Sequence, residues 1–115
     1  MLRIMCRGKI HKAHITKKDL HYHGSIGIDG KLLRAADMLA GERVQVLNIN
    51  NGMRFETYCI EEKAHSGIIS LYGPAARLGA IGDTVIIISY VLMDTNEAKK
   101  LRPKIVHVDK DNKIV

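Results

Sequence analysis

Histidine is the residue type in this sequence whose spacing most directly suggests chemistry. Two pairs stand out among the six histidines: His11 and His14 in an HxxH motif, and His21 and His23 in an HxH motif. On a strand, His21 and His23 would share a face and could bind one metal ion. Such pairs are commonly surface residues, so a metal site is the less favoured interpretation and no metal ligand is predicted.

A Gly-Ser dipeptide at residues 24 and 25 is the second candidate. The sequence contains no GxxxxGK[ST] or GxGxxG phosphate-binding loop and no GxSxG nucleophile motif. Gly24 and Ser25 stand between Tyr22-His23 and an apolar stretch that starts at Ile26. By itself such a dipeptide indicates a turn or a bulge, and a chemical role depends on the residues that the rest of the chain brings to it.

Positive charge is concentrated at the start of the chain. The 115 residues carry 18 Lys and Arg against 12 Asp and Glu, a formal net charge of +6. Six of the basic residues precede the first acidic one: Arg3, Arg7, Lys9, Lys12, Lys17 and Lys18. The pattern allows a strand that contacts nucleic-acid phosphates, a solvated face, or a cationic pocket for a small acidic substrate. The lack of interleaved aromatic residues weakens the first interpretation.

The length and composition indicate one domain with an aliphatic core. A chain of 115 residues suits a single domain, and 46% apolar residues with moderate charge exclude intrinsic disorder. There is no Trp and one Phe, so the core must come from Ile, Leu, Val, Met and Ala. No apolar run suits a membrane span, and the charged N-terminus does not resemble a secretory signal. Cys6 and Cys59 are therefore expected to be reduced thiols in a cytoplasmic protein.

Segments of strand character make up most of the first half of the chain. Residues 2–15 alternate unevenly and predict a long strand bent near Gly8. Thr16–Asp19 has capping-box spacing and predicts a short helical turn. The segment 21–28 returns to strand character. A helix that ends at Gly41 is predicted from apolar residues at helical spacing: Leu32, Leu33, Ala36 and Leu39.

The second half predicts further short strands, and the whole pattern a mainly β barrel. Asn50-Asn51-Gly52 marks a hairpin, and in its second strand Thr57 and Tyr58 would face opposite sides unless the strand twists locally. Pro74 predicts the start of a helical turn. The predicted ranges are strands at 43–49, 53–60, 67–71, 84–93 and 105–108, helical turns at 73–77 and 97–101, and a frayed end at 110–115.

A set of residues, taken in order along the chain, resembles the pyruvoyl-dependent aspartate 1-decarboxylase family. The set comprises Lys9, His11, Tyr22, Gly24, Ser25, Arg54, Thr57, Tyr58, Gly73, Pro74, Ala75 and Ala76. It lies within the stretches MLRIMCRGKIHKAHIT, DLHYHGSIGID, NNGMRFETY, GPAARLGAIGD and VIIISYVLM, and the resemblance covers nearly the whole chain. Two positions depart from the family pattern: Tyr72 stands where Asn is expected, and Pro74 where Ala is expected.

The resemblance implies a double-psi β-barrel with one short helix and a few helical turns, assembled as a homotetramer with active sites between neighbouring subunits. It implies that the single domain 1–115 cleaves itself between Gly24 and Ser25 into a β chain, 1–24, and an α chain, 25–115. Attack of Ser25 on the preceding carbonyl, elimination and hydrolysis would leave a pyruvoyl group, whose ketone forms a Schiff base with the substrate amine. Neither pyridoxal phosphate nor a metal is expected. Whether cleavage needs a maturation partner stays open.

The implied activity is that of a carboxy-lyase, which converts L-aspartate to β-alanine and carbon dioxide in pantothenate biosynthesis. A dicarboxylate needs positive charge, and the resemblance assigns Lys9 and Arg54 to this task. His11 lies two residues beyond Lys9, on the same strand face, and is expected to bind substrate as well.

The remaining roles follow from the same resemblance. Thr57 would assist self-cleavage and contact the substrate, and Tyr58 would donate a proton to the carbanion. Tyr22 would contact the cleavage point. The substrate-binding loop would consist of Gly73, Pro74 and Ala75.

Two other interpretations stay open at the level of sequence. A basic β-barrel could bind nucleic acid without any catalysis, although this rests only on the net charge and the basic first strand. A barrel of the same family could also have lost catalysis, through Tyr72 or through failed maturation. Cleavage between Gly24 and Ser25 would support the decarboxylase, whereas binding that weakens steeply with salt would support the nucleic-acid module.

Overall fold

Strands dominate the computed structural model, which describes residues 1–115. The elements follow one another as β1 (Leu2–His14), β2 (Lys17–Asp19), β3 (Ser25–Asp29), α1 (Gly30–Ala35), β4 (Arg43–Asn48), β5 (Arg54–Glu62), β6 (Ile69–Tyr72), the 3-10 helix η1 (Gly73–Leu78), β7 (Thr84–Asp94), α2 (Thr95–Ala98) and β8 (Lys104–His107). None of the helices is both long and apolar enough to cross a membrane.

One eight-stranded sheet, in the order β2-β6-β3-β5-β4-β7-β1-β8, wraps around the core. The β1–β8, β2–β6 and β3–β5 pairs are parallel and the others antiparallel. At the end of β1, His14 is still paired with Thr84 of β7, whereas the N–H of Thr16 donates to the carbonyl of Ile69 in β6 at 2.8 Å. This hydrogen bond links the chain after β1, near one edge of the sheet, to β6, near the other edge. The strands therefore close into a barrel around the interior. The prediction of a mainly β barrel with one short helix and a few helical turns is confirmed.

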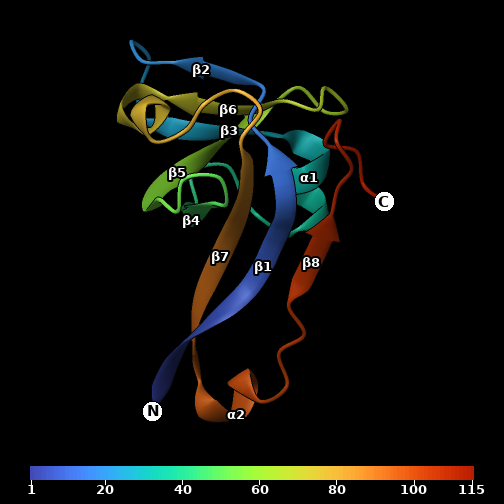
Figure 1. Ribbon diagram of the computed structural model, residues 1–115. Coiled ribbons are helices and arrows are strands. Elements are labelled where there is room, and N and C mark those ends of the chain that lie inside the picture. Colours follow the sequence, from blue (N-terminus) through green and yellow to red (C-terminus); the bar gives the residue numbers. More distant parts are fainter.

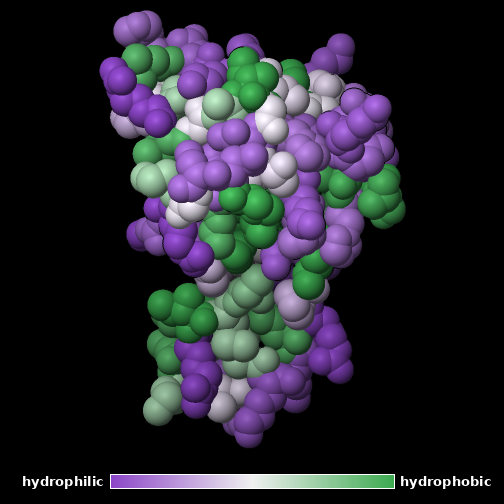
Figure 2. All heavy atoms as spheres, in the orientation of Figure 1, coloured by the Kyte–Doolittle hydropathy of each residue, from purple (hydrophilic) through white to green (hydrophobic).

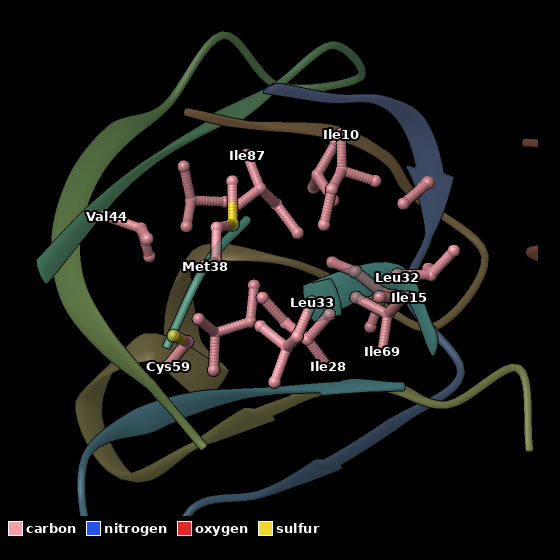
Figure 3. Close-up of a cluster of buried hydrophobic side chains, with 14 of the residues drawn as sticks. Ile10, Ile15, Ile28, Leu32, Leu33, Met38, Val44, Cys59, Ile69 and Ile87 are labelled. Carbon is pink, nitrogen blue, oxygen red and sulfur yellow. The ribbon is translucent and has the colours of Figure 1, made fainter. Parts of the chain in front are cut away.

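The core is aliphatic, as the composition predicted. Nineteen buried residues form one cluster, and β1, β4 and β7 contribute Ile10, Val44 and Ile87 to it (Figure 3). Leu32 and Leu33 enter it from α1. Each fully buried aliphatic side chain contributes about 1.5–3 kcal/mol relative to an exposed one. This cluster therefore holds the strands that carry the candidate site.

The predicted bend near Gly8 is confirmed. The pairing of β1 with β7 shifts register between Cys6 and Gly8. A Cβ at Gly8 would lie 2.3 Å from the carbonyl oxygen of Ala36, so only glycine allows this approach of the chain that follows α1. Before the bend, β1 and β7 run together as a two-stranded extension away from the barrel and end near α2 (Figure 1).

The helical turn predicted at Thr16–Asp19 is wrong. The hydroxyl of Thr16 donates to the carbonyl of Ile69 and accepts from the N–H of the same residue, at 3.2 and 3.1 Å. It is therefore used across the sheet and not as a helix cap, and Lys17–Asp19 pairs with β6 as a strand. The strand predicted at 21–28 begins only at Ser25.

The C-terminal segment is ordered, so the prediction of a frayed end at 110–115 is wrong. Val108 and Ile114 form a β-bridge, and Asn112 is 1% exposed. The Asn112 side chain accepts from the N–H of His14 and donates to the carbonyls of His14 and Gly67, at 2.7, 2.9 and 2.8 Å. These hydrogen bonds fix the end of the chain to the end of β1.

Two helices differ from their predicted ranges. The helix α1 stops at Ala35, and Asp37 has a left-handed φ of 57°, which ends the helix well before Gly41. The turn predicted at 97–101 lies earlier, because the side chain of Asp94 caps α2 by accepting from the N–H of Glu97 at 3.1 Å.

Candidate active site

Ser25 is the first residue of β3 and is 1% exposed. It lies opposite Tyr72 in the antiparallel pairing of β3 with β6. Its hydroxyl donates to the carbonyl of His23 at 3.3 Å. A buried serine hydroxyl is thus held at the point where an irregular segment enters the barrel.

The backbone around Gly24 is contacted closely by Gly73. Gly73 has a left-handed φ of 65°, and a Cβ there would lie 2.7 Å from the Cα of Gly24 and 2.9 Å from the carbonyl oxygen of Tyr22. Gly24 itself is not in the left-handed region. The position that demands glycine on conformational grounds is therefore Gly73, which packs the substrate-loop candidate onto the predicted cleavage point.

A pocket of about 220 Å³ opens beside Gly24. Four residues singled out in the sequence line it, namely Gly24, Thr57, Pro74 and Ala75, and they are joined by Phe55, Glu56 and Leu78. Pro74 stands in the first turn of η1, where its missing N–H costs no helical hydrogen bond. The structure thus brings together the predicted cleavage point, Thr57 and the predicted loop.

Thr57 and Tyr58 face opposite sides of β5. Thr57 is half-buried and Tyr58 is exposed, and the pairing of β4 with β5 shows no register shift. Both nevertheless line an open pocket of about 460 Å³ with Arg43 and Glu56, so no local twist of the strand is needed. Tyr58 does not line the pocket beside Gly24.

The cationic candidates lie elsewhere on the molecule. Lys9 and His11 are on β1, flanked by β7 and β8. Arg54 is exposed at the start of β5 and lines a separate surface pocket around the Asn50–Gly52 turn. Within one chain, none of the three lines the pocket beside Gly24.

His11 has an unusual environment for a strand histidine. Its Nδ1 is buried without a hydrogen-bond partner, and its ring meets that of His107 edge-on at 5.4 Å. Burial lowers the pKa of His11 below its ordinary value of 6.5, and the charges of Lys9 and His107 lower it further. His11 is therefore a neutral ring at pH 7, able to donate or accept one hydrogen bond.

Glu62 and Tyr72 form a polar pair that the sequence did not predict. Tyr72 is 5% exposed, and its hydroxyl donates to the carboxylate of Glu62 at 2.7 Å. The ring of Tyr72 lies 4.7 Å from that of Tyr22, the residue predicted to contact the cleavage point. Burial raises the pKa of Tyr72, and Glu62 raises it further. The alternation of β5 and β6 gave no sign of this pair, because it joins two strands that are not hydrogen-bonded neighbours.

The histidine motifs form no metal-binding cluster, and one basic residue of the first strand is used within the barrel. No group of three or more His, Cys, Asp and Glu side chains is arranged to hold a metal ion, and His21 and His23 are exposed. Arg7 is engaged internally: it pairs with Asp37 at 2.9 Å and with Glu42 at 2.6 Å. One of the basic residues that suggested phosphate binding thus stabilises the barrel.

The fold and site together define a small β-barrel protein with a pocket beside Gly24 and the buried Ser25. The chain matches the family described as aspartate decarboxylase over residues 1–115. It belongs to the aspartate decarboxylase family, as the resemblance predicted.

Three curated relatives match this chain over its full length. Proteins named aspartate 1-decarboxylase are 54% identical in Thermoanaerobacter pseudethanolicus, 57% in Carboxydothermus hydrogenoformans and 55% in Pelotomaculum thermopropionicum. Each alignment covers all of this chain and 98%, 91% and 87% of the respective relative. Among solved structures, the designed proteins mkDPBB_sym1 and msDPBB_sym2 align over 77% of this chain and 99% of theirs, with TM-scores of 0.48 and 0.46 and identities of 15% and 18%.

Proposed function

We propose that this chain decarboxylates L-aspartate to β-alanine and carbon dioxide, with a pyruvoyl group made from its own Ser25. The observation that carries the proposal is the buried Ser25 next to Gly24, which lines a pocket together with Thr57, in a chain that belongs to the aspartate decarboxylase family. The relatives named above support the substrate and the reaction, and the site supports the source of the cofactor.

Self-cleavage would begin with attack of the Ser25 hydroxyl on the carbonyl carbon of Gly24. The acyl group moves from nitrogen to oxygen, so the peptide bond becomes an ester. Elimination removes the Cα proton of Ser25 and releases Gly24 as a carboxylate, and water then replaces nitrogen as ammonia leaves. Thr57 lines the pocket beside Gly24, and its hydroxyl could stabilise the negative charge that develops on the Gly24 carbonyl oxygen.

The residues around Ser25 fit a pyruvoyl group there. Gly24, which carries no side chain, lines the pocket and directly precedes the buried Ser25. A pyruvoyl group would supply the electron sink for the loss of carbon dioxide, without pyridoxal phosphate or metal. The protein's part is to bind the carboxylates and to return one proton to the substrate carbon.

The remaining site residues divide between these two tasks. Arg54 offers a bidentate fork and Lys9 a point charge to the two carboxylates, and His11 adds a neutral hydrogen-bonding ring. Tyr58 would deliver the proton. The loop that would seat the substrate consists of Gly73, Pro74 and Ala75.

Assembly as a homotetramer would complete the site. Lys9 and His11 lie on a different part of the chain from the Gly24 pocket, so a neighbouring subunit is the natural source of these side chains. The exposed apolar residues of the β1–β7 extension supply a surface for such an assembly (Figure 2). The cytoplasmic location and the role in pantothenate biosynthesis stay predictions.

Intact mass spectrometry of the purified chain, followed by an assay for β-alanine, tests the function. Fragments 1–24 and 25–115, the larger blocked at its N-terminus, together with β-alanine formed from L-aspartate, are expected. Ser25→Ala should abolish both cleavage and turnover. Activity retained by Ser25→Ala would sink the pyruvoyl mechanism, and a wild-type chain that stays whole and inactive after prolonged warming, with cell extract as well as without it, would contradict the proposed function. Addition of cell extract to an uncut chain shows whether a maturation factor is needed.

A further inference from the structure

Three polar side chains follow one another on the outer face of β5. Arg54, Glu56 and Tyr58 stand at alternate positions and therefore share a side of the strand. Alternate residues are about 7 Å apart along a strand, within reach of long side chains. The carboxylate of Glu56 could thus compete with a substrate carboxylate for the Arg54 guanidinium.

Arg43 engages Glu56 in this structure. The Nη2 of Arg43 donates to Oε2 of Glu56 across the β4–β5 pair, where Gln45 lies directly opposite Glu56. The four ion pairs of the chain use Arg7 twice, Arg34 and Arg43. Arg54 takes part in none of them, so its guanidinium is available to a ligand.

Glu56 also lines three pockets, two of which contain residues of the candidate site. It lines the pocket beside Gly24 and the open pocket on the outer face, which is lined by Arg43, Thr57 and Tyr58 as well. A dicarboxylate bound in the pocket beside Gly24 would lie near the charge of Glu56. Like charges disfavour each other unless a cation offsets them.

We propose that Arg43 is a positioning residue that sets the affinity for the dicarboxylate substrate. By pairing with Glu56 it keeps that carboxylate away from Arg54 and offsets its charge beside the pocket. Arg43 touches no reacting atom. The inference rests on the proposed function, because it concerns how L-aspartate is bound at that same site.

The expected effect is modest and depends on salt. The side chains of Arg43 and Glu56 are 80% and 47% exposed, so solvent and ions screen their charges. Arg43→Gln is expected to raise the KM for L-aspartate by about three- to tenfold at low ionic strength, with kcat per cleaved subunit nearly unchanged. The increase should shrink at an ionic strength of about 0.5 M.

Two further variants separate this role from a structural one. In Arg43→Gln/Glu56→Gln the unpaired carboxylate is gone, and the KM should return to within about twofold of the wild-type value. Arg34→Gln is the matched control, because it removes another exposed Arg–Glu pair, that with Glu61, and changes the net charge equally. Its KM should equal that of the wild type.

The experiment is steady-state decarboxylation by all four proteins, with the cleaved fraction of each measured by mass spectrometry. An unchanged KM in Arg43→Gln, an equal rise in Arg34→Gln, or no rescue by Glu56→Gln would overturn the inference while the activity of the wild type still supported the proposed function. If Arg43→Gln does not fold, Glu56→Gln alone decides: its KM should not exceed that of the wild type, and a severalfold rise would overturn the inference. A wild-type chain without activity overturns both proposals.

Discussion

At the scale of single residues, Gly73 has little freedom to change. Its φ of 65° is left-handed, and the atoms nearest to a new Cβ belong to the backbone of Gly24 and Tyr22, which cannot rotate away. Gly52 has a similar φ of 75°, but a Cβ there would meet nothing within 4 Å. Substitutions at these two glycines therefore separate the cost of a left-handed backbone, present at both, from the cost of a steric clash, present only at Gly73.

We expect Gly52→Ala to destabilise the protein by about 1 kcal/mol through backbone strain alone. Gly73→Ala should cost at least about 2 kcal/mol more, since the clash displaces the segment at Gly24, and it should slow or block self-cleavage. Urea unfolding and the cleaved fraction of each variant measure the two effects. Equal stability and equal cleavage in the two variants would show that the close approach of Gly73 to Gly24 affects neither folding nor self-cleavage.

At the scale of elements, Asp29 joins the start of α1 to the loop between β5 and β6. Its carboxylate accepts from three backbone N–H groups, those of Gly67, Lys31 and His65, at 2.8, 2.8 and 3.0 Å. Burial raises the pKa of Asp29, but these donors lower it by more, so the net shift is below the usual 3.8. The charged carboxylate is therefore the form that the fold stabilises.

A group whose pKa is lower in the folded state stabilises the protein above its unfolded pKa, and this stabilisation is lost as the pH falls through the folded value. Asp29→Asn should therefore cost about 1–3 kcal/mol at pH 7, and its difference from the wild type should narrow below about pH 4. The urea midpoints of the variant and of the wild type, at pH 7 and at about pH 2.5, provide the measurement. Asp19→Asn, at an exposed residue with one backbone hydrogen bond, is the control and should change little. A stability difference between Asp29→Asn and the wild type that is as large at about pH 2.5 as at pH 7 would contradict the stabilising role of the charged Asp29 carboxylate.

At the scale of the whole molecule, the β1–β7 extension exposes apolar side chains that no other part of the same chain covers. Ile4 and Leu92 lie opposite each other in the pairing of the two strands and are 74% and 59% exposed. Adjacent apolar side chains of this kind mark an interaction surface. Apolar side chains also gather on this narrower part of the molecule in Figure 2.

We expect Ile4→Lys/Leu92→Lys to weaken assembly and to lower decarboxylase activity with it, because the site would draw Lys9 and His11 from a neighbouring subunit. Light scattering should give a smaller mass than for the wild type, while the circular dichroism of the barrel is retained. Ile81→Lys, at another exposed apolar residue away from this extension, should leave the mass unchanged. A double variant that assembles and turns over like the wild type would refute this use of the extension.

Much of the fold was predictable because its signals are local. Alternating side chains predicted β5, the strongly apolar stretch from Thr84 predicted β7, and Asn50-Asn51-Gly52 predicted the hairpin that the structure shows. The resemblance to the family predicted four of the residues that line one pocket, namely Gly24, Thr57, Pro74 and Ala75. Asn112 and Thr16 were missed, because their side chains bond to segments far away along the chain.

The sequence by itself determined the family, the aliphatic barrel and the residues able to act, since residue type, spacing and order carry that information. Only the tertiary structure decided which of them meet: Gly73 against Gly24, Tyr72 on Glu62, and Arg43 on Glu56. It also decided that Lys9 and Arg54 stand apart from the pocket within one chain. The physical reason is that burial, close approach and charge pairing depend on distances between segments, and those distances exist only once the barrel has closed.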